Sequence, residues 1–295
     1  MATITFLGRD DDWENLDNWD GHALPVDADD VIVPRTARSS LIRHVDRRCD
    51  SGGAGLDLNT FLVQRGYKGN IGGEGAPFCA SVNSATTTKP AITHRGDGTL
   101  HFADIALHVV WTMLVNSPNH RNAVRLTGTG PVAPIGATLA IVDGHVHIGP
   151  SVGSFNRVLL GPKRATNSMS RRAPTSASRP MPRLTTRAGG LAYVYMRDGE
   201  VDSTSVCTEV NLAGGQWTQS DGFVTTTTVG QGRFILNSSV VQPLVYLMGG
   251  VYDTTQTDDA KAITNSYKYP SAVFKKSDSL TITKEYSMFD EEWDG

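Results

Sequence analysis

Large apolar residues recur at similar intervals in the last third of the chain, each after a turn that contains small residues. Val201, Trp217, Phe234, Tyr252 and Phe274 are separated by 16, 17, 18 and 22 positions. A unit of this length is too short to form a core of its own, so neighbouring units must stack to bury their apolar faces. The pattern therefore predicts a β-solenoid in which each unit forms one rung.

Short strand-like segments continue this rhythm through most of the sequence. Each is rich in β-branched or aromatic residues and is followed within about four residues by Gly, Asn, Asp or Ser. Examples are residues 60–63, 139–142, 145–148, 193–196 and 280–283. The segments between them lack the apolar period of a helix, which argues against alternating strands and helices. We predict an all-β fold, namely a single-stranded parallel β-helix with an N-terminal cap and an inserted basic loop.

The predicted organisation has five parts. They are an N-terminal capping segment with the first rungs (1–50), β-helix rungs (51–160), a basic inserted loop or arm (161–190), further rungs (191–284) and an acidic C-terminal tail (285–295). Residues 161–190 carry seven basic residues and no acid, among many Pro and Ser residues. We expect this composition to be incompatible with a rung.

Charge is distributed unevenly along the chain. The net charge of −3 excludes a globally basic nucleic-acid binder, yet residues 1–30 carry nine acids against one basic residue, Arg9. Such asymmetry suggests electrostatic docking to a partner or between subunits. Solvated loops and ends are the alternative. The predicted partner-binding residues are Arg164, Arg171, Arg172, Arg179, Arg183 and Arg187.

The cysteines and the N-terminus give expectations about compartment. Cys49, Cys79 and Cys207 are odd in number and far apart, so we expect small buried or semi-buried thiols and neither a disulfide framework nor a metal site. The first residues have no basic segment followed by a long apolar one, so no signal peptide is expected. No apolar run is long enough to span a membrane.

One stretch resembles a known family. Trp13, Asn18, Trp19 and Pro25, followed by Asp30-Val31-Ile32-Val33, form a pattern similar to the start of parallel β-helix proteins encoded by tailed bacteriophages. The rung-like residues 61–72 extend the resemblance. It implies a virion component, such as a head decoration protein or an appendage. On physical grounds the two tryptophans can plug the end of a narrow core, and Pro25 can rigidify the turn, so these four residues form the predicted structural cap.

Candidate chemistry is sparse. Glu200 and Asp202 lie at i and i+2, on one face of a strand, and are the best local pair for glycoside hydrolysis. The other candidates are an acidic cluster (Asp253, Asp258 and Asp259), a histidine pair (His145 and His147) and the acids of residues 13–30 as calcium ligands, although these acids lack the order of an EF-hand. Acids at solvated corners and satisfied surface histidines are the structural alternatives.

The sequence favours a non-enzymatic virion protein, a decoration or cement protein that binds the major capsid protein or another virion protein. We expect no cofactor, no metal, no membrane contact and no nucleic acid, and self-association into a trimer stays open. The first alternative is a tailspike-like polysaccharide depolymerase. The second is a glycan-binding appendage with aromatic platforms among Trp111, Trp217, Tyr246 and Tyr252.

Overall fold

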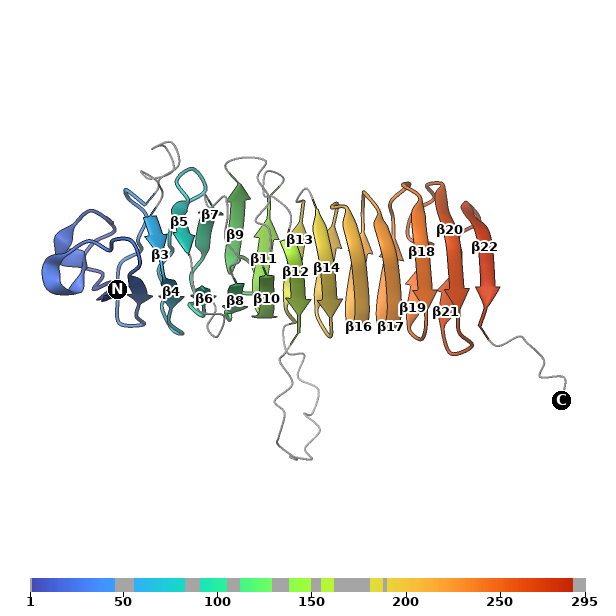
Figure 1. Ribbon diagram of the computed structural model, residues 1–295, viewed down its shortest axis with the longest axis horizontal. Helices are drawn as coiled ribbons and strands as arrows, with labels where there is room; N and C mark the ends of the chain where they lie inside the picture. Colours follow the sequence, from blue (N-terminus) through green and yellow to red (C-terminus); the bar gives the residue numbers. More distant parts are fainter. Residues whose placement is uncertain are drawn as a thin grey trace, which may run out of the picture.

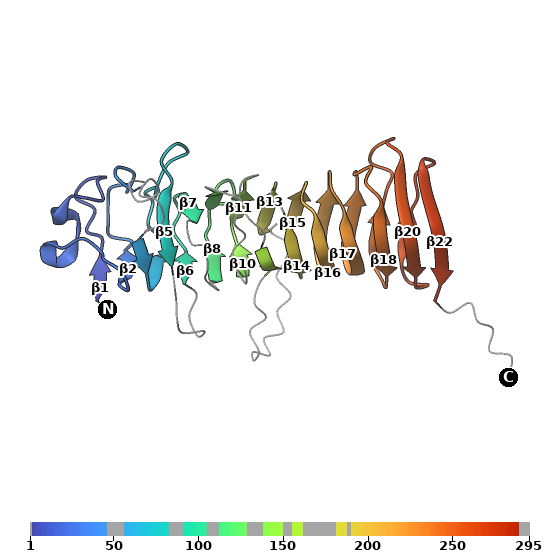
Figure 2. The same cartoon turned by 45° about the horizontal axis from the view of Figure 1, so that its top comes forward.

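The computed structural model describes residues 2–45, 56–82, 91–104, 112–128, 138–149, 155–161, 181–187 and 190–288. Within these residues the chain is all-β, with 22 strands in one sheet system and two short 3-10 helices, η1 (Leu16–Asn18) and η2 (Asp20–His22). The strands stack into an elongated body, with the N-terminal strands at one end and the C-terminal strands at the other (Figure 1). Figure 2 shows the same stack turned about its long axis.

The strand bounds are β1 (Thr3–Thr5), β2 (Asp30–Val33), β3 (Leu56–Leu58), β4 (Thr60–Val63), β5 (Phe78–Val82), β6 (Ile92–His94), β7 (Leu100–Asp104), β8 (Thr112–Asn116), β9 (Val124–Gly128), β10 (Thr138–Asp143), β11 (His145–Ile148), β12 (Phe155–Leu160), β13 (Arg183–Thr186), β14 (Leu191–Met196), β15 (Glu200–Ser203), β16 (Cys207–Gln219), β17 (Val224–Leu236), β18 (Gln242–Leu247), β19 (Val251–Asp253), β20 (Lys261–Lys268), β21 (Val273–Lys275) and β22 (Leu280–Ser287).

The pairing is parallel between all of these strands and follows two ladders. Ladder A contains β8, β10, β12 and β14, and ladder B contains β9, β11, β13 and β15. Strands β16 and β17 are long enough to belong to both ladders. This arrangement fits a β-solenoid-like fold, and it confirms the predicted all-β class and parallel pairing.

The recurring apolar residues of the last third are partners in the same ladder. Val201 pairs with Trp217, Trp217 with Phe234, Phe234 with Tyr252, and Tyr252 with Phe274. The rings of Trp217 and Phe234 are stacked with centroids 6.4 Å apart, and those of Phe234 and Tyr252 are 4.9 Å apart. The predicted period is therefore confirmed as the repeat of successive rungs.

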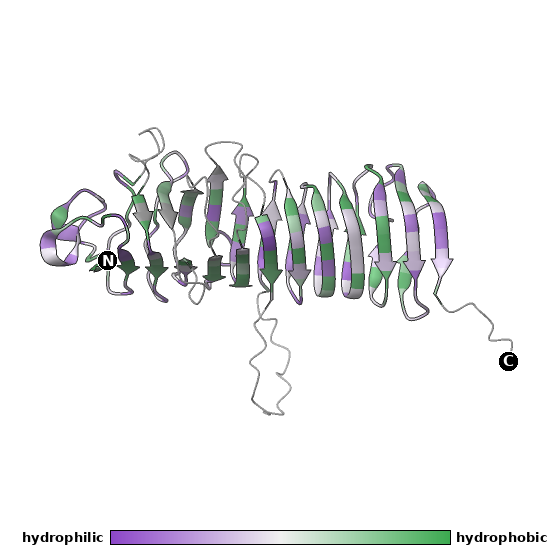
Figure 3. Cartoon of the chain, viewed as in Figure 1, coloured by the Kyte–Doolittle hydropathy of each residue, from purple (hydrophilic) through white to green (hydrophobic). Residues whose placement is uncertain are grey.

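Side chains alternate between the core and the surface along the strands. In β14, Leu191, Val194 and Met196 are buried, whereas Tyr193 and Tyr195 are exposed. Figure 3 shows the same alternation of hydrophobic and hydrophilic positions along many of the strands. Since parallel pairing keeps equivalent side chains in register, each outward position continues as a row from rung to rung.

Two expected boundaries differ from the structure. Strand β13 lies inside the segment 161–190 that we expected to contain no rung: Leu184 and Thr186 are buried between outward-facing neighbours, an alternation that the average composition conceals. Strand β22 extends to Ser287, beyond the expected start of the acidic tail. There the exposed Glu285 pairs with Lys276, and Tyr286 stacks on the tyrosine of the preceding rung.

Candidate functional site

Aromatic residues of the N-terminal segment pack onto the end of the core. Trp13 and Trp19 are buried with ring centroids 4.7 Å apart, and the Trp19 indole N–H donates to the carbonyl oxygen of Trp13 at 2.8 Å. Trp13 also contacts Phe78, and Phe6 contacts Trp19. The indoles therefore connect the N-terminal segment to the aromatic interior of the first rungs.

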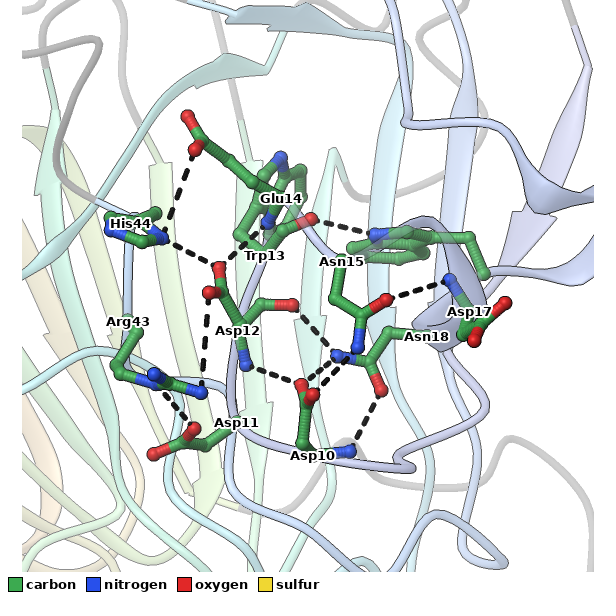
Figure 4. Close-up of polar contacts among 11 residues, drawn as sticks. Asp10, Asp11, Asp12, Trp13, Glu14, Asn15, Asp17, Asn18, Arg43 and His44 are labelled. Atoms are coloured by element: carbon green, nitrogen blue, oxygen red, sulfur yellow. Dashed lines mark hydrogen bonds and ion pairs between the residues drawn. The ribbon is translucent and has the colours of Figure 1, made fainter.

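A polar cluster holds this segment in place (Figure 4). Asn18 is completely buried, and its Oδ1 accepts from the backbone N–H groups of Arg9 and Asp10 at 2.8 and 2.9 Å. Its Nδ2 donates to the Asp10 carboxylate and to the carbonyl oxygen of Asp12. The Asp12 carboxylate also contacts Nδ1 of His44 at 2.7 Å. All hydrogen-bonding groups of the Asn18 amide are satisfied, which gives this residue a structural role.

Electrostatics support the same interpretation of this cluster. The N–H of Asp12 and the side chain of Asn15 donate to Asp10 and hold its pKa below the usual value. Burial opposes ionisation of Asp12, but hydrogen bonds from His44 and from the backbone of Glu14 outweigh it and lower the pKa. Both acids are therefore stabilised as carboxylates by protein donors.

Pro25 is buried at the start of the turn that leads into β2. The carboxylate of Asp29 closes this turn, because it accepts from the backbone N–H groups of Ala2 and Val26 at 2.7 and 3.1 Å. The structure thus places Trp13, Asn18, Trp19 and Pro25, the four predicted cap residues, in one continuous N-terminal unit.

The predicted partner-binding arginines are described only in part. Arg164, Arg171, Arg172 and Arg179 lie outside the described residues. Arg183, the first residue of β13, forms an ion pair with Glu200 at 2.9 Å, and the exposed Arg187 directly follows β13. These two arginines therefore belong to the edge of a rung.

Arg183 and Arg187 form part of a basic flank on ladder B, together with Arg125, His145 and His147. Arg125 of β9 pairs with His147 of β11, and His145 pairs with Arg183 of β13. Burial lowers the pKa of His147, and nearby Arg125 and Arg187 lower it further. We call these five residues the basic flank.

His145 and His147 are held by protein contacts and, within the described ranges, lack a third ligand side chain for a metal ion. The rings of His145 and His147 lie 3.9 Å apart between centroids, and each Nε2 has a protein partner, the Thr185 hydroxyl and the Arg121 carbonyl oxygen respectively. Burial, His147 and Arg183 together lower the pKa of His145 to about 4, so this imidazole is neutral at pH 7. Among the described residues, no group of three or more His, Cys, Asp or Glu side chains could hold a metal ion.

Glu200 and Asp202 line a shallow depression of about 370 Å³ on ladder B, next to His145 and Arg183. Both carboxylates already have protein partners. Glu200 is paired with Arg183, and Asp202 accepts from the Ser220 hydroxyl at 2.9 Å. These contacts connect neighbouring rungs and give each carboxylate a structural role.

The second acidic cluster is divided between interior and surface. Asp253 is buried, whereas Asp258 and Asp259 are exposed. Burial opposes ionisation of Asp253, but the N–H and hydroxyl of Thr255 and an ion pair with Arg233 outweigh it and lower the pKa. Asp253 therefore fixes a corner of the solenoid-like stack.

Most of the aromatic residues proposed from the sequence as platforms for glycan stacking are not available to a glycan. Trp217 and Tyr252 are fully buried, and Tyr246 stacks on Tyr267 with centroids 5.1 Å apart. Trp111 lies outside the described residues. Tyr193 and Tyr195 of β14 are instead exposed next to each other on one face of a strand, a feature that the predicted strand 193–196 did not single out.

The cysteines differ from expectation in one respect. Cys79 is disulfide-bonded, so the prediction that all three cysteines are thiols was wrong. Spacing alone cannot reveal which distant residues stacking brings together. Cys207 is a free, buried thiol, and burial raises its pKa to about 12. Cys49 lies outside the described residues.

Comparisons with known proteins do not assign the chain to a family. No family model, no curated protein and no solved structure matches the chain. In the described part of the chain, no helix has both the length and the apolar character needed to cross a membrane.

Proposed function

We propose that this chain is a single-stranded parallel β-helix with an N-terminal cap, and that it decorates or cements the capsid of a tailed bacteriophage. The two-ladder pairing and the aromatic N-terminal unit support the fold. The resemblance of residues 13–72 to phage β-helix proteins supports the location in the virion. A stack of this kind presents a long, rigid surface that suits repeated contacts with a symmetrical particle.

The observation that carries the proposal is the basic flank. Arg125 lies on β9, and Arg183 and Arg187 lie on the β13 rung, with His145 and His147 of β11 between them. Arg125 pairs with Glu74 and Arg183 with Glu200, whereas Arg187 forms no ion pair among the described residues. Such a row is complementary to an acidic surface on the major capsid protein, where guanidinium groups can form paired hydrogen bonds with carboxylates. Arg164, Arg171, Arg172 and Arg179 would add to this surface, and no cofactor is required.

Rebinding to particles that lack the chain tests this proposal. Arg125→Glu combined with Arg187→Glu should weaken occupancy by about tenfold or more at low salt, since reversed charges meet like charges on the partner. Occupancy of the unmodified protein should also fall as salt rises. Arg65→Glu is the matched control, because Arg65 is exposed and lies away from the basic flank. Unchanged occupancy of the double variant at every salt concentration contradicts the proposal.

The depolymerase alternative has a separate test. Glu200→Gln combined with Asp202→Asn preserves side-chain shape and should leave the behaviour of the particle toward polysaccharide unchanged, since a decoration protein uses neither carboxylate in catalysis. Capsular polysaccharide that is cleaved by the unmodified protein but not by this folded variant would identify an enzyme.

A further inference from the structure

Two tyrosines project into solvent from the middle of ladder A. Tyr193 and Tyr195 of β14 are 51% and 38% exposed, whereas the residues on either side of Tyr195 are buried in the core. Their backbone is held in the sheet by pairing with β12 and β16. Aromatic side chains fixed in this way offer a large contact area and lose little conformational freedom on binding.

The tyrosines lie in a groove of about 360 Å³ that crosses three rungs, a volume within the usual range of small-ligand sites of about 300–1,000 Å³. Strand register places Arg157 and Glu209 on opposite sides of Tyr193, and Asn211 beside Tyr195. Asn156 also lines the groove. Polar side chains therefore surround both rings.

Contacts within the protein orient Tyr195, Glu209 and Asn211. The guanidinium of Arg197 lies 5.4 Å from the centre of the Tyr195 ring, and the Asn211 amide donates to one oxygen of Glu209 at 2.6 Å. The other Glu209 oxygen and the Asn211 carbonyl oxygen can accept further hydrogen bonds. Arg157 forms no ion pair among the described residues, so its N–H groups can donate to a ligand.

This combination selects one ligand chemistry. The groove offers a donor-only side chain (Arg157), an acceptor-only side chain (Glu209) and amides that do both, and hydroxyl groups can satisfy all of them. The tyrosine faces suit the apolar face of a sugar ring. A nucleic-acid backbone is less suitable, because its phosphates only accept hydrogen bonds and would be repelled by Glu209. We propose that this tyrosine groove binds an oligosaccharide.

An array of bacterial surface oligosaccharides is the direct probe, followed by calorimetry with the glycan that binds most strongly. Tyr193→Ala and Tyr195→Ala should each weaken binding by about tenfold, since exposed anchor aromatics contribute at this level. Tyr193→Phe keeps the ring and should retain most of the affinity. Tyr246→Ala is the matched control, because Tyr246 lies on the same ladder three rungs further on, outside the groove.

Three results would overturn the proposal. They are binding to none of the glycans, binding by both alanine variants as strong as that of the unmodified protein, or displacement of the glycan by single-stranded DNA. The tyrosine groove is on ladder A and the basic flank is on ladder B. Particle occupancy should therefore be unchanged in the tyrosine variants, so failure of the glycan proposal and failure of capsid docking can be distinguished.

Discussion

Replacing Gly232 with alanine should destabilise the chain by about 2–4 kcal/mol. Gly232 has a φ of +85°, where a Cβ costs about 1–2 kcal/mol, and a Cβ here would lie 2.4 Å from the carbonyl oxygen of Gly215 in the preceding rung. Relieving that contact requires the rungs to separate, an overpacking cost of about 1–3 kcal/mol. The reduced freedom of the unfolded chain offsets about 0.4–1 kcal/mol of the total.

Three other glycines separate these contributions. Gly21 has a φ of +76° and nothing within 4 Å, so its alanine variant should lose about 1 kcal/mol from the backbone alone. Gly249 lacks a positive φ, but a Cβ would lie 2.4 Å from a backbone oxygen, so it reports the contact alone. Gly73 has neither feature, so Gly73→Ala should leave the stability of the protein unchanged or raise it slightly.

Urea unfolding followed by far-UV circular dichroism measures these differences, because the free energy of unfolding falls linearly with denaturant. We expect the order of destabilisation Gly232→Ala, then Gly249→Ala, then Gly21→Ala, with Gly73→Ala last. If Gly232→Ala is no more destabilising than Gly21→Ala, the corner glycines do not stack as described, and the reasoning about rung contacts is wrong.

Tyr252→Phe removes a buried hydroxyl that has no hydrogen-bond partner among the described residues. The free energy of unfolding measured in urea should therefore be unchanged or rise by up to about 1 kcal/mol. A decrease of more than about 2 kcal/mol contradicts this expectation. Asn18→Ala leaves the part-buried backbone groups of Arg9, Asp10 and Asp12 without their Asn18 partner and should cost about 1–3 kcal/mol in the same assay. No measurable change would mean that the N-terminal unit does not depend on Asn18. The pKa values of Asp10, Asp12 and Asp253 are lowered in the folded chain, so their stabilising contribution is complete above the ordinary Asp pKa of about 3.9 and is lost as pH falls through the lowered values. The melting temperature should therefore fall progressively below about pH 4. A melting temperature that stays constant there argues against these contacts.

The sequence predicts the repeat because the period and the register have the same physical origin. A glycine corner followed by a large apolar residue returns once per rung, and Trp217, Phe234 and Tyr252 consequently become neighbours in one ladder. Unequal spacing does not hide the period, since extra residues are accommodated at the corners. The fold class follows from local pattern alone.

Surface sites could not be predicted in the same way, because they combine residues from rungs of unequal length. Alternation along β14 could have identified Tyr193 and Tyr195 as outward-facing. Their neighbours Arg157 and Glu209 follow only from the register between strands. The same limit applies to the basic flank. Composition marked residues 161–190 as one basic segment, whereas stacking places Arg183 beside His145.

The copy number of this chain in purified particles tests the central claim most directly. Quantitative mass spectrometry can measure it against the major capsid protein of the same particles. A decoration protein should be present in a fixed ratio to the capsid subunits, with a copy number of the same order as theirs. Absence from the particle, or only a handful of copies per particle as in a tail spike, would contradict the account.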